Sequence, residues 1–84
     1  MSYISRTEEI VNKKKQFAKD YFEKKYPTET EREEKEEVFK EIIDQIEVCE
    51  DFCRPVNEEQ IKEWFECKNV EQVLRKARTH KYAA

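Results

Sequence analysis

Hydrophobic side chains recur at intervals of three and four along residues 6–25, which is the spacing of one face of an α-helix. On a helical wheel, this face contains Ile10, Val11, Phe17, Ala18, Tyr21 and Phe22. Ser5 and Glu8 have the spacing of a capping box, in which two side chains satisfy free backbone N–H groups at a helix start. Tyr26 precedes Pro27, and a residue before proline avoids the helical conformation. The pattern therefore predicts a helix over residues 6–25.

A broader hydrophobic arc follows in residues 29–52 and covers almost half of the helix circumference. It contains Val38, Phe39, Ile42, Ile43, Ile46, Cys49, Phe52 and Cys53. The opposite face is acidic and contains Glu33, Glu36, Glu37, Asp44, Glu47 and Asp51. Thr28 and Glu31 repeat the capping-box spacing, and Pro55 closes the segment. We expect a central helix that packs on more than one neighbour.

Two shorter hydrophobic patterns follow towards the C-terminus. Asn57 and Asn69 each precede one of them, and each is followed three residues later by a glutamine, again the capping-box spacing. The face of the first, over residues 58–66, contains Ile61, Trp64 and Phe65. The face of the second, over residues 70–80, contains Val70, Val73, Leu74 and Ala77.

These segments together predict one all-α domain over residues 1–84, a small bundle of three to four helices. A long hairpin of 6–25 and 29–52 is expected to carry the two shorter helices on its open face, with sequential helices roughly antiparallel. The chain contains no glycine, so positive φ angles are costly everywhere. Tight β-hairpins and phosphate-binding loops are therefore excluded, and we expect prolines and N-caps to set the helix boundaries.

The net charge of −3 conceals an uneven distribution. Residues 1–26 contain seven basic and four acidic side chains, residues 27–53 three and eleven, and residues 54–84 seven and five. An acidic middle segment therefore lies between two mildly basic ends. A solvated helix face is the simpler interpretation of such a carboxylate stripe, and an electrostatic docking surface for a basic protein is the functional one.

We predict a small intracellular protein-interaction module, such as an adapter, an accessory subunit or an inhibitor. Its expected contacts are the acidic side chains Glu33, Glu36, Glu37, Asp44 and Glu47, together with Lys14 and the apolar surface near Trp64. Lys14 is unusual because it points into the middle of the hydrophobic arc. Either its stem lies along the core edge, or it pairs with an acid of residues 29–52, or this region belongs to an interface. A homo-oligomer is also expected, because so small a domain gains stability by association.

Nucleic-acid binding is the alternative interpretation. Residues 58–80 predict two helices joined by a short turn, broadly as in a helix-turn-helix domain. The second of these helices bears Arg75, Lys76, Arg78, His80 and Lys81, and the lysines of residues 6–25 are Lys13, Lys14, Lys15, Lys19, Lys24 and Lys25. However, the turn lacks glycine, and Glu71 lies where a recognition helix approaches DNA. Nucleic acid is therefore the less favoured partner.

A metal or redox site built from Cys49, Cys53, Cys67 and His80 is the third interpretation. Their spacing fits no common zinc motif, and two of the thiols lie within the hydrophobic arc, where cysteine behaves as a small apolar residue. We therefore expect no metal and no cofactor. A single histidine and the lack of a nucleophile motif argue against an enzyme.

The cysteine count and the chain start bear on the compartment. An odd number of cysteines and no signal-peptide pattern favour the reducing cytoplasm. No apolar run approaches the roughly 20 residues that a membrane span needs, so we expect no membrane span.

Overall fold

The structure, a computed structural model, describes residues 6–82 of the chain. These residues form four α-helices and no strand: α1 (Arg6–Lys25), α2 (Glu29–Asp51), α3 (Glu58–Trp64) and α4 (Val70–Lys81). The prediction of an all-α fold is confirmed. The predicted helix limits differ from the observed ones by no more than two residues.

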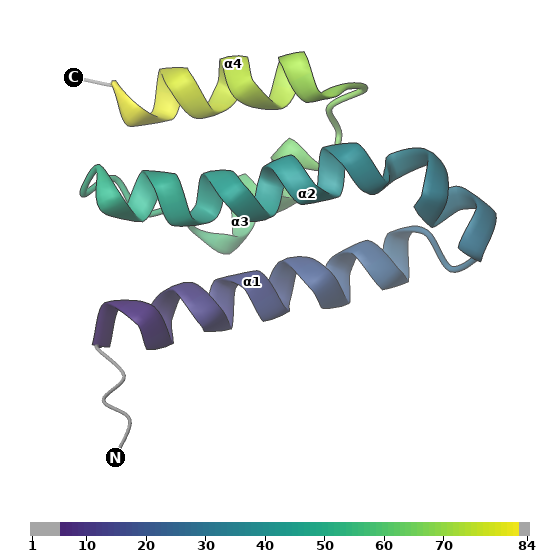
Figure 1. The fold of residues 1–84 in the computed structure, drawn as a ribbon, viewed down its shortest axis with the longest axis horizontal. Coiled ribbons are helices and arrows are strands. Elements are labelled where there is room, and N and C mark those ends of the chain that lie inside the picture. The colour runs from purple at the N-terminus through teal and green to yellow at the C-terminus, as the bar shows by residue number, and fades with distance from the viewer. Residues whose placement is uncertain (1–5, 83–84) are drawn as a thin grey trace.

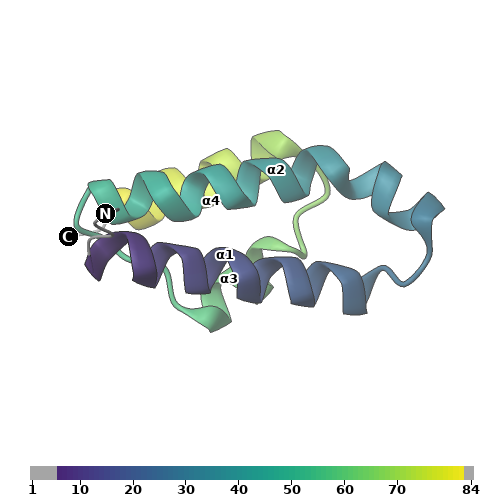
Figure 2. The same cartoon turned by 60° about the horizontal axis from the view of Figure 1, so that its bottom comes forward.

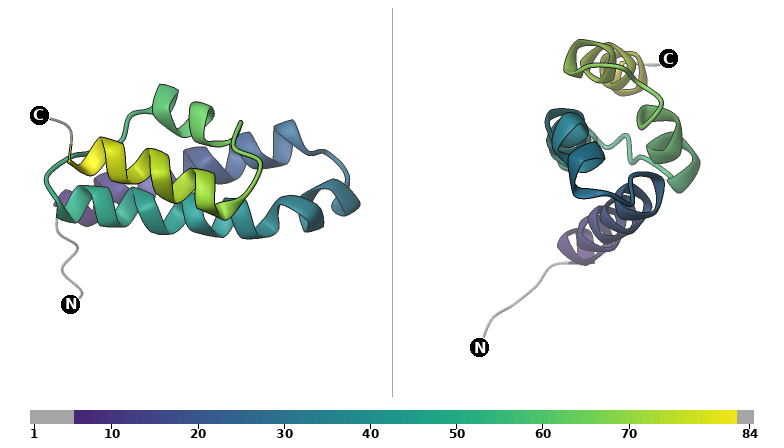
Figure 3. Two further views of the ribbon diagram at one scale, coloured as in Figure 1. Left: turned by 90° about the horizontal axis from the view of Figure 1, so that it is seen from above. Right: turned by 90° about the vertical axis from the view of Figure 1, so that its right-hand side faces the viewer.

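Three helices lie side by side in one layer, and the fourth covers one side of it. The hairpin of α1 and α2 is antiparallel, and α4 lies on the other side of α2 (Figure 1). Figure 2 and Figure 3 show that α3 lies against α1, on one side of the layer. The prediction of a central helix with more than one neighbour is confirmed, since α2 contacts both α1 and α4.

The direction of α4 differs from a simple up-and-down bundle. Because α3 returns the chain along the hairpin, α4 runs in the same direction as α2, as Figure 1 shows. The two shorter helices therefore occupy different positions in the fold. While α3 covers the hairpin, α4 extends the layer and leaves its other side uncovered.

The core draws apolar side chains from all four helices. Fully buried members include Ala18 of α1, Ile42 and Ile46 of α2, Ile61 of α3 and Val73 of α4. Aromatic rings fill the space where α1, α2 and the end of α3 meet. Phe22 stacks on Phe39 with ring centroids 4.3 Å apart, and Phe65 packs on Phe22 at 6.0 Å.

Local capping chemistry begins three of the helices as expected. Thr28, Asn57 and Asn69 are N-caps whose side chains accept hydrogen bonds from the backbone N–H three residues later. At Asn57 the capping box is complete, because the Gln60 side chain accepts in return from the Asn57 N–H at 3.0 Å. The predicted cap at Ser5 lies outside the described residues.

The end of α2 corrects the expectation that proline sets this boundary. Phe52 caps the helix and Cys53 follows with φ 58°, in the left-handed region that favours glycine. The Arg54 N–H donates to the Cys49 carbonyl at 2.9 Å, and the Cys53 N–H donates to the Glu50 carbonyl at 3.0 Å. This pair of bonds is a Schellman motif, so α2 ends before Pro55 and without glycine.

Four side chains predicted to be buried are exposed. Phe52 and Cys53 leave the hydrophobic arc because α2 ends before them. Ile10 is 41% exposed beside a shallow pocket near the start of α3. Leu74 is 40% exposed because α4 is an edge helix, covered on one side only.

Candidate functional site

The predicted acidic contacts lie together on the solvent side of α2. We call the exposed side chains Glu33, Glu36, Glu37, Asp44 and Glu47 the acidic face of α2. Helical spacing places them opposite the buried residues Val38, Ile42 and Cys49. The acidic face therefore lies on the side of the layer that α3 does not cover.

Only part of this acidic face is neutralised within the chain. Glu36 pairs with Lys40 at 3.4 Å, and Glu47 pairs with Lys15 of α1 at 3.0 Å. Glu33, Glu37 and Asp44 form no ion pair with any residue that the structure describes. Three carboxylates of the face are thus left to interact with solvent or with another molecule.

Lys14 belongs to the contact between α1 and α2. Its side chain is 21% exposed, and its Nζ lies 3.9 Å from Glu50 Oε2. Of the three arrangements considered for this lysine, the structure shows the pair with an acid of α2. Lys14 and Lys15 therefore both place their charge along the α1 edge of α2, beside the acidic face.

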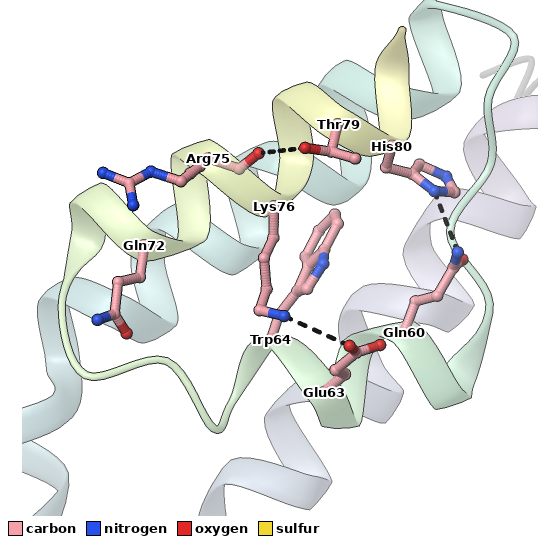
Figure 4. Close-up of a pocket in the computed structure, with 8 residues that line it drawn as sticks. All are labelled: Gln60, Glu63, Trp64, Gln72, Arg75, Lys76, Thr79 and His80. Atoms are coloured by element: carbon pink, nitrogen blue, oxygen red, sulfur yellow. Dashed lines mark hydrogen bonds and ion pairs between the residues drawn. The ribbon is translucent and has the colours of Figure 1, made fainter. Parts of the chain in front are cut away.

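Trp64 is placed differently from the other predicted contacts. It is 3% exposed, so its indole belongs to the core and does not form an exposed apolar surface. Figure 4 shows it at the inner side of a pocket of about 610 Å³ between α3 and α4. The other lining residues are Gln60, Glu63, Gln72, Arg75, Lys76, Thr79 and His80.

Two polar links cross this pocket from α3 to α4 (Figure 4). Lys76 Nζ lies 3.4 Å from Glu63 Oε1, and Gln60 Nε2 lies 3.0 Å from His80 Nδ1. Of the charged residues that line the pocket, Glu63 and Lys76 therefore pair with each other, while Arg75 pairs with Glu71 outside the lining. A bound molecule would have to compete with these internal pairs.

His80 joins three parts of the chain through both ring nitrogens. Its Nε2 lies 2.9 Å from the Arg54 carbonyl oxygen and 3.1 Å from that of Pro55. Because carbonyl oxygens only accept, Nε2 carries the proton, and Nδ1 accepts from the Gln60 amide. The amide is oriented by the capping box of α3. His80 therefore fixes α4 to the loop after α2, and both of its ring nitrogens are engaged in hydrogen bonds.

The cysteines do not form a cluster with His80. No group of three or more His, Cys, Asp or Glu side chains among residues 6–82 is arranged to hold a metal ion. Cys49 and Cys67 are buried free thiols, and Cys53 is an exposed one. Burial raises the pKa of both Cys49 and Cys67, although Lys81 opposes the shift at Cys49 and Lys76 opposes it at Cys67. The two buried thiols are thus held in their protonated, unreactive form.

A group of exposed residues at the C-terminal ends of α2 and α4 was not predicted. Phe52 is 47% exposed and Tyr82 is 67% exposed. Their rings meet edge to face at 5.8 Å, and Lys81 Nζ lies 5.3 Å from the centre of the Phe52 ring. Phe52 and Tyr82 are the residues that end α2 and α4, so both lie just beyond the packed part of their helix.

The surface cations of α4 are only partly paired. Arg75 lies 3.5 Å from Glu71 across one helical turn, and Lys76 pairs with Glu63. Arg78 is exposed and has no ion pair with another described residue. The helix that carries these cations packs along α2, and the helix before it has seven residues.

Comparison with known proteins gives no relative from which a role could be transferred. The chain matches no protein-family model, and neither a curated protein nor a solved structure is significantly similar to it. None of the described helices combines the length and the apolar character needed to cross a membrane. Functional inference therefore rests on the surfaces of the molecule itself.

Proposed function

We propose that this chain is a small protein-interaction module, an adapter, accessory subunit or inhibitor that acts by binding and not by catalysis. The acidic face of α2 carries this proposal. Its carboxylates project from a single helix of 23 residues, and three of them pair with no cation among residues 6–82. A protein partner with a basic patch would supply the missing counter-charges.

Such a face favours selective recognition of a partner more than high affinity. Exposed charge pairs add little affinity each, but complementary fields raise association rates and discriminate between partners. Salt screens exposed charges, and the Debye length falls to about 8 Å at physiological ionic strength. Added salt would therefore weaken the complex. Strong salt dependence is therefore part of the proposal.

Placement in the cytoplasm is part of the same proposal. Three free cysteines, two of them buried, suit a reducing compartment. A binding role is further supported by His80, whose ring nitrogens are both engaged in hydrogen bonds that hold the fold.

Affinity capture from the native cell, with the acidic face reversed, tests the proposal. In the face variant Glu33→Lys, Glu37→Lys and Asp44→Lys are combined, because these side chains form no ion pair within the described part of the chain. Glu47 is left unchanged, since its loss would also break the pair with Lys15. We expect the wild-type chain to retain a basic protein that the face variant does not retain.

A matched control separates location from net charge. Combining Asp20→Lys, Glu23→Lys and Glu59→Lys changes the charge by the same amount at exposed positions away from the acidic face. Retention by this control, together with loss from the face variant, supports the proposal. Equal retention by all three chains contradicts it.

Nucleic-acid binding is the second candidate function, and the exposed cations of α4 favour it. Arg78 forms no ion pair with a residue that the structure describes, and Arg75 forms only a long one. An electrophoretic shift with DNA or RNA at about 50 mM salt, lost at about 200 mM, would support this function. No shift at the lower salt concentration would remove it.

A further inference from the structure

The uncovered side of the layer carries both signs of charge. On α4, the side chains of Gln72, Lys76 and His80 line the pocket and therefore face α3. Leu74 and Arg78 lie about half a turn away from them, so they lie on the side of the layer that α3 does not cover. The acidic face of α2 lies on this same side, next to Arg78 and Lys81, which we call the basic strip of α4. Glu71 lies about two turns before Arg78 on the same side of α4.

Exposed apolar side chains lie between these two charged strips. Phe52 and Tyr82 meet across the ends of α2 and α4. Leu74 continues the apolar line two turns earlier on α4, where it is also exposed. A surface with an apolar centre between an acidic and a basic strip is the composition of a protein contact, with a dry core and a charged rim.

We propose that a second copy of this chain covers this surface. The two copies are related by a two-fold axis that lies over the surface, above the line where α2 and α4 meet, and runs parallel to both helices. Rotation by 180° about this axis places α2 of one copy over α4 of the other, and the same contact then occurs twice. Acidic strips meet basic strips, and the apolar centres meet each other. The proposal adds a second copy as an occupant of the acidic face and therefore rests on the proposed function.

The register of the dimer follows from the ring contact. Because Phe52 touches Tyr82, the C-terminal ends of α2 and α4 lie at the same height, and both helices rise by about 1.5 Å per residue. The axis preserves height, so Asp51 of one copy lies level with Lys81 of the other. Asp44 lies about one turn from the level of Arg78 and within reach of its long side chain.

Reciprocal charge reversal tests this geometry in the full-length chain. One variant combines Asp44→Lys with Asp51→Lys, and the other combines Arg78→Glu with Lys81→Glu. Light scattering after size exclusion at about 1 mM protein detects even millimolar association. We expect a wild-type dimer that each variant weakens about 100-fold, because like charges then meet in both symmetric contacts.

Mixing the two variants gives the decisive result. In an equimolar mixture, lysines on α2 of one chain meet glutamates on α4 of the other, and the unchanged strips also match. A heterodimer should therefore form where neither variant dimerises alone. A wild-type monomer at about 1 mM, or a folded mixture that stays monomeric, would overturn the proposal.

Two further variants make the test robust. Leu74→Gln changes only the apolar centre, so it should weaken the dimer even if a charge-reversed chain fails to fold. Asp20→Lys with Glu23→Lys on α1 matches the charge change outside the surface and should leave the dimer intact. Equal dimerisation of the Leu74→Gln variant and the wild type would contradict the proposal.

Failure of the dimer and failure of the proposed function remain distinguishable. The variant with Arg78→Glu and Lys81→Glu keeps the acidic face of α2, so it should still capture a basic partner from the cell. Capture by this chain together with a monomeric wild type would overturn the dimer alone.

Discussion

Replacing Cys53 by glycine should stabilise this protein. Cys53 has φ 58°, the only positive φ among the described residues, and it occupies the left-handed position of a Schellman motif. A side chain with a Cβ pays about 1–2 kcal/mol in this conformation, and glycine does not. Part of that gain is offset because glycine also increases the freedom of the unfolded chain. We therefore expect a net stabilisation of about 1 kcal/mol.

Chemical and thermal denaturation, both followed by far-UV circular dichroism, measure this change. For a domain of this size, about 1 kcal/mol corresponds to a rise of roughly 4–8 °C in Tm. Cys53→Ala is the matched control, because it removes the exposed thiol but keeps the Cβ, and it should change stability by less than about 0.5 kcal/mol. If the glycine variant were no more stable than the alanine variant, the left-handed cap would not be strained as argued.

Three other predictions concern the loop after α2 and the thiols. His80→Phe keeps an aromatic ring beside Trp64 but loses the hydrogen bonds to the loop and to α3. The free energy of unfolding should therefore fall by about 1–2 kcal/mol. Unchanged stability would refute the role of the ring nitrogens. A thiol reagent should modify Cys53 rapidly in the native protein and the other two cysteines only as the protein unfolds, which mass spectrometry can follow; three equal rates would contradict the burial. Burial raises the pKa of Cys49 and Cys67, so the unfolded chain loses these protons first, and the free energy of unfolding should fall as pH rises above 9.0. The fall should be less steep in a Cys49→Ala variant, and an identical slope would contradict the raised pKa.

The helices could be predicted from sequence because their determinants are local. Thr28, Asn57 and Asn69 cap helices through side chains that act over three residues, and the wheel of residues 29–52 separates acidic from buried positions without any tertiary information. The exposure of the acidic face was predictable for the same reason. Its pairing was not, since the partner of Glu47 is Lys15, 32 residues away.

The predictions differ from the structure where tertiary packing determines a helix end or the burial of a side chain. A wheel cannot show that α2 stops at Asp51, because a left-handed residue without glycine leaves no signal in the sequence. Phe52 consequently moved from the expected core to the surface. Leu74 has the helical spacing of a core residue, but whether that side of α4 is covered depends on which side α3 occupies. The contacts of His80 likewise join segments 20 and 26 residues away.

The charge reversals at the acidic face also determine how the two proposals relate. If the captured basic partner and the second copy use the same surface, they compete, and adding the partner should dissociate the dimer. If the partner binds without dissociating it, the two contacts occupy different parts of the layer. Light scattering with increasing amounts of the partner distinguishes these outcomes.

Mapping the bound surface by NMR tests the central claim most directly. The ¹⁵N-labelled chain is titrated with the unlabelled partner that affinity capture identifies, and amide shifts are followed residue by residue. We expect the largest changes along the outward side of α2, at Glu33, Glu37 and Asp44, with reversal at high salt. Changes concentrated at the pocket between α3 and α4, around Gln72 and Lys76, with α2 unaffected, would contradict the claim that the acidic face is the binding surface.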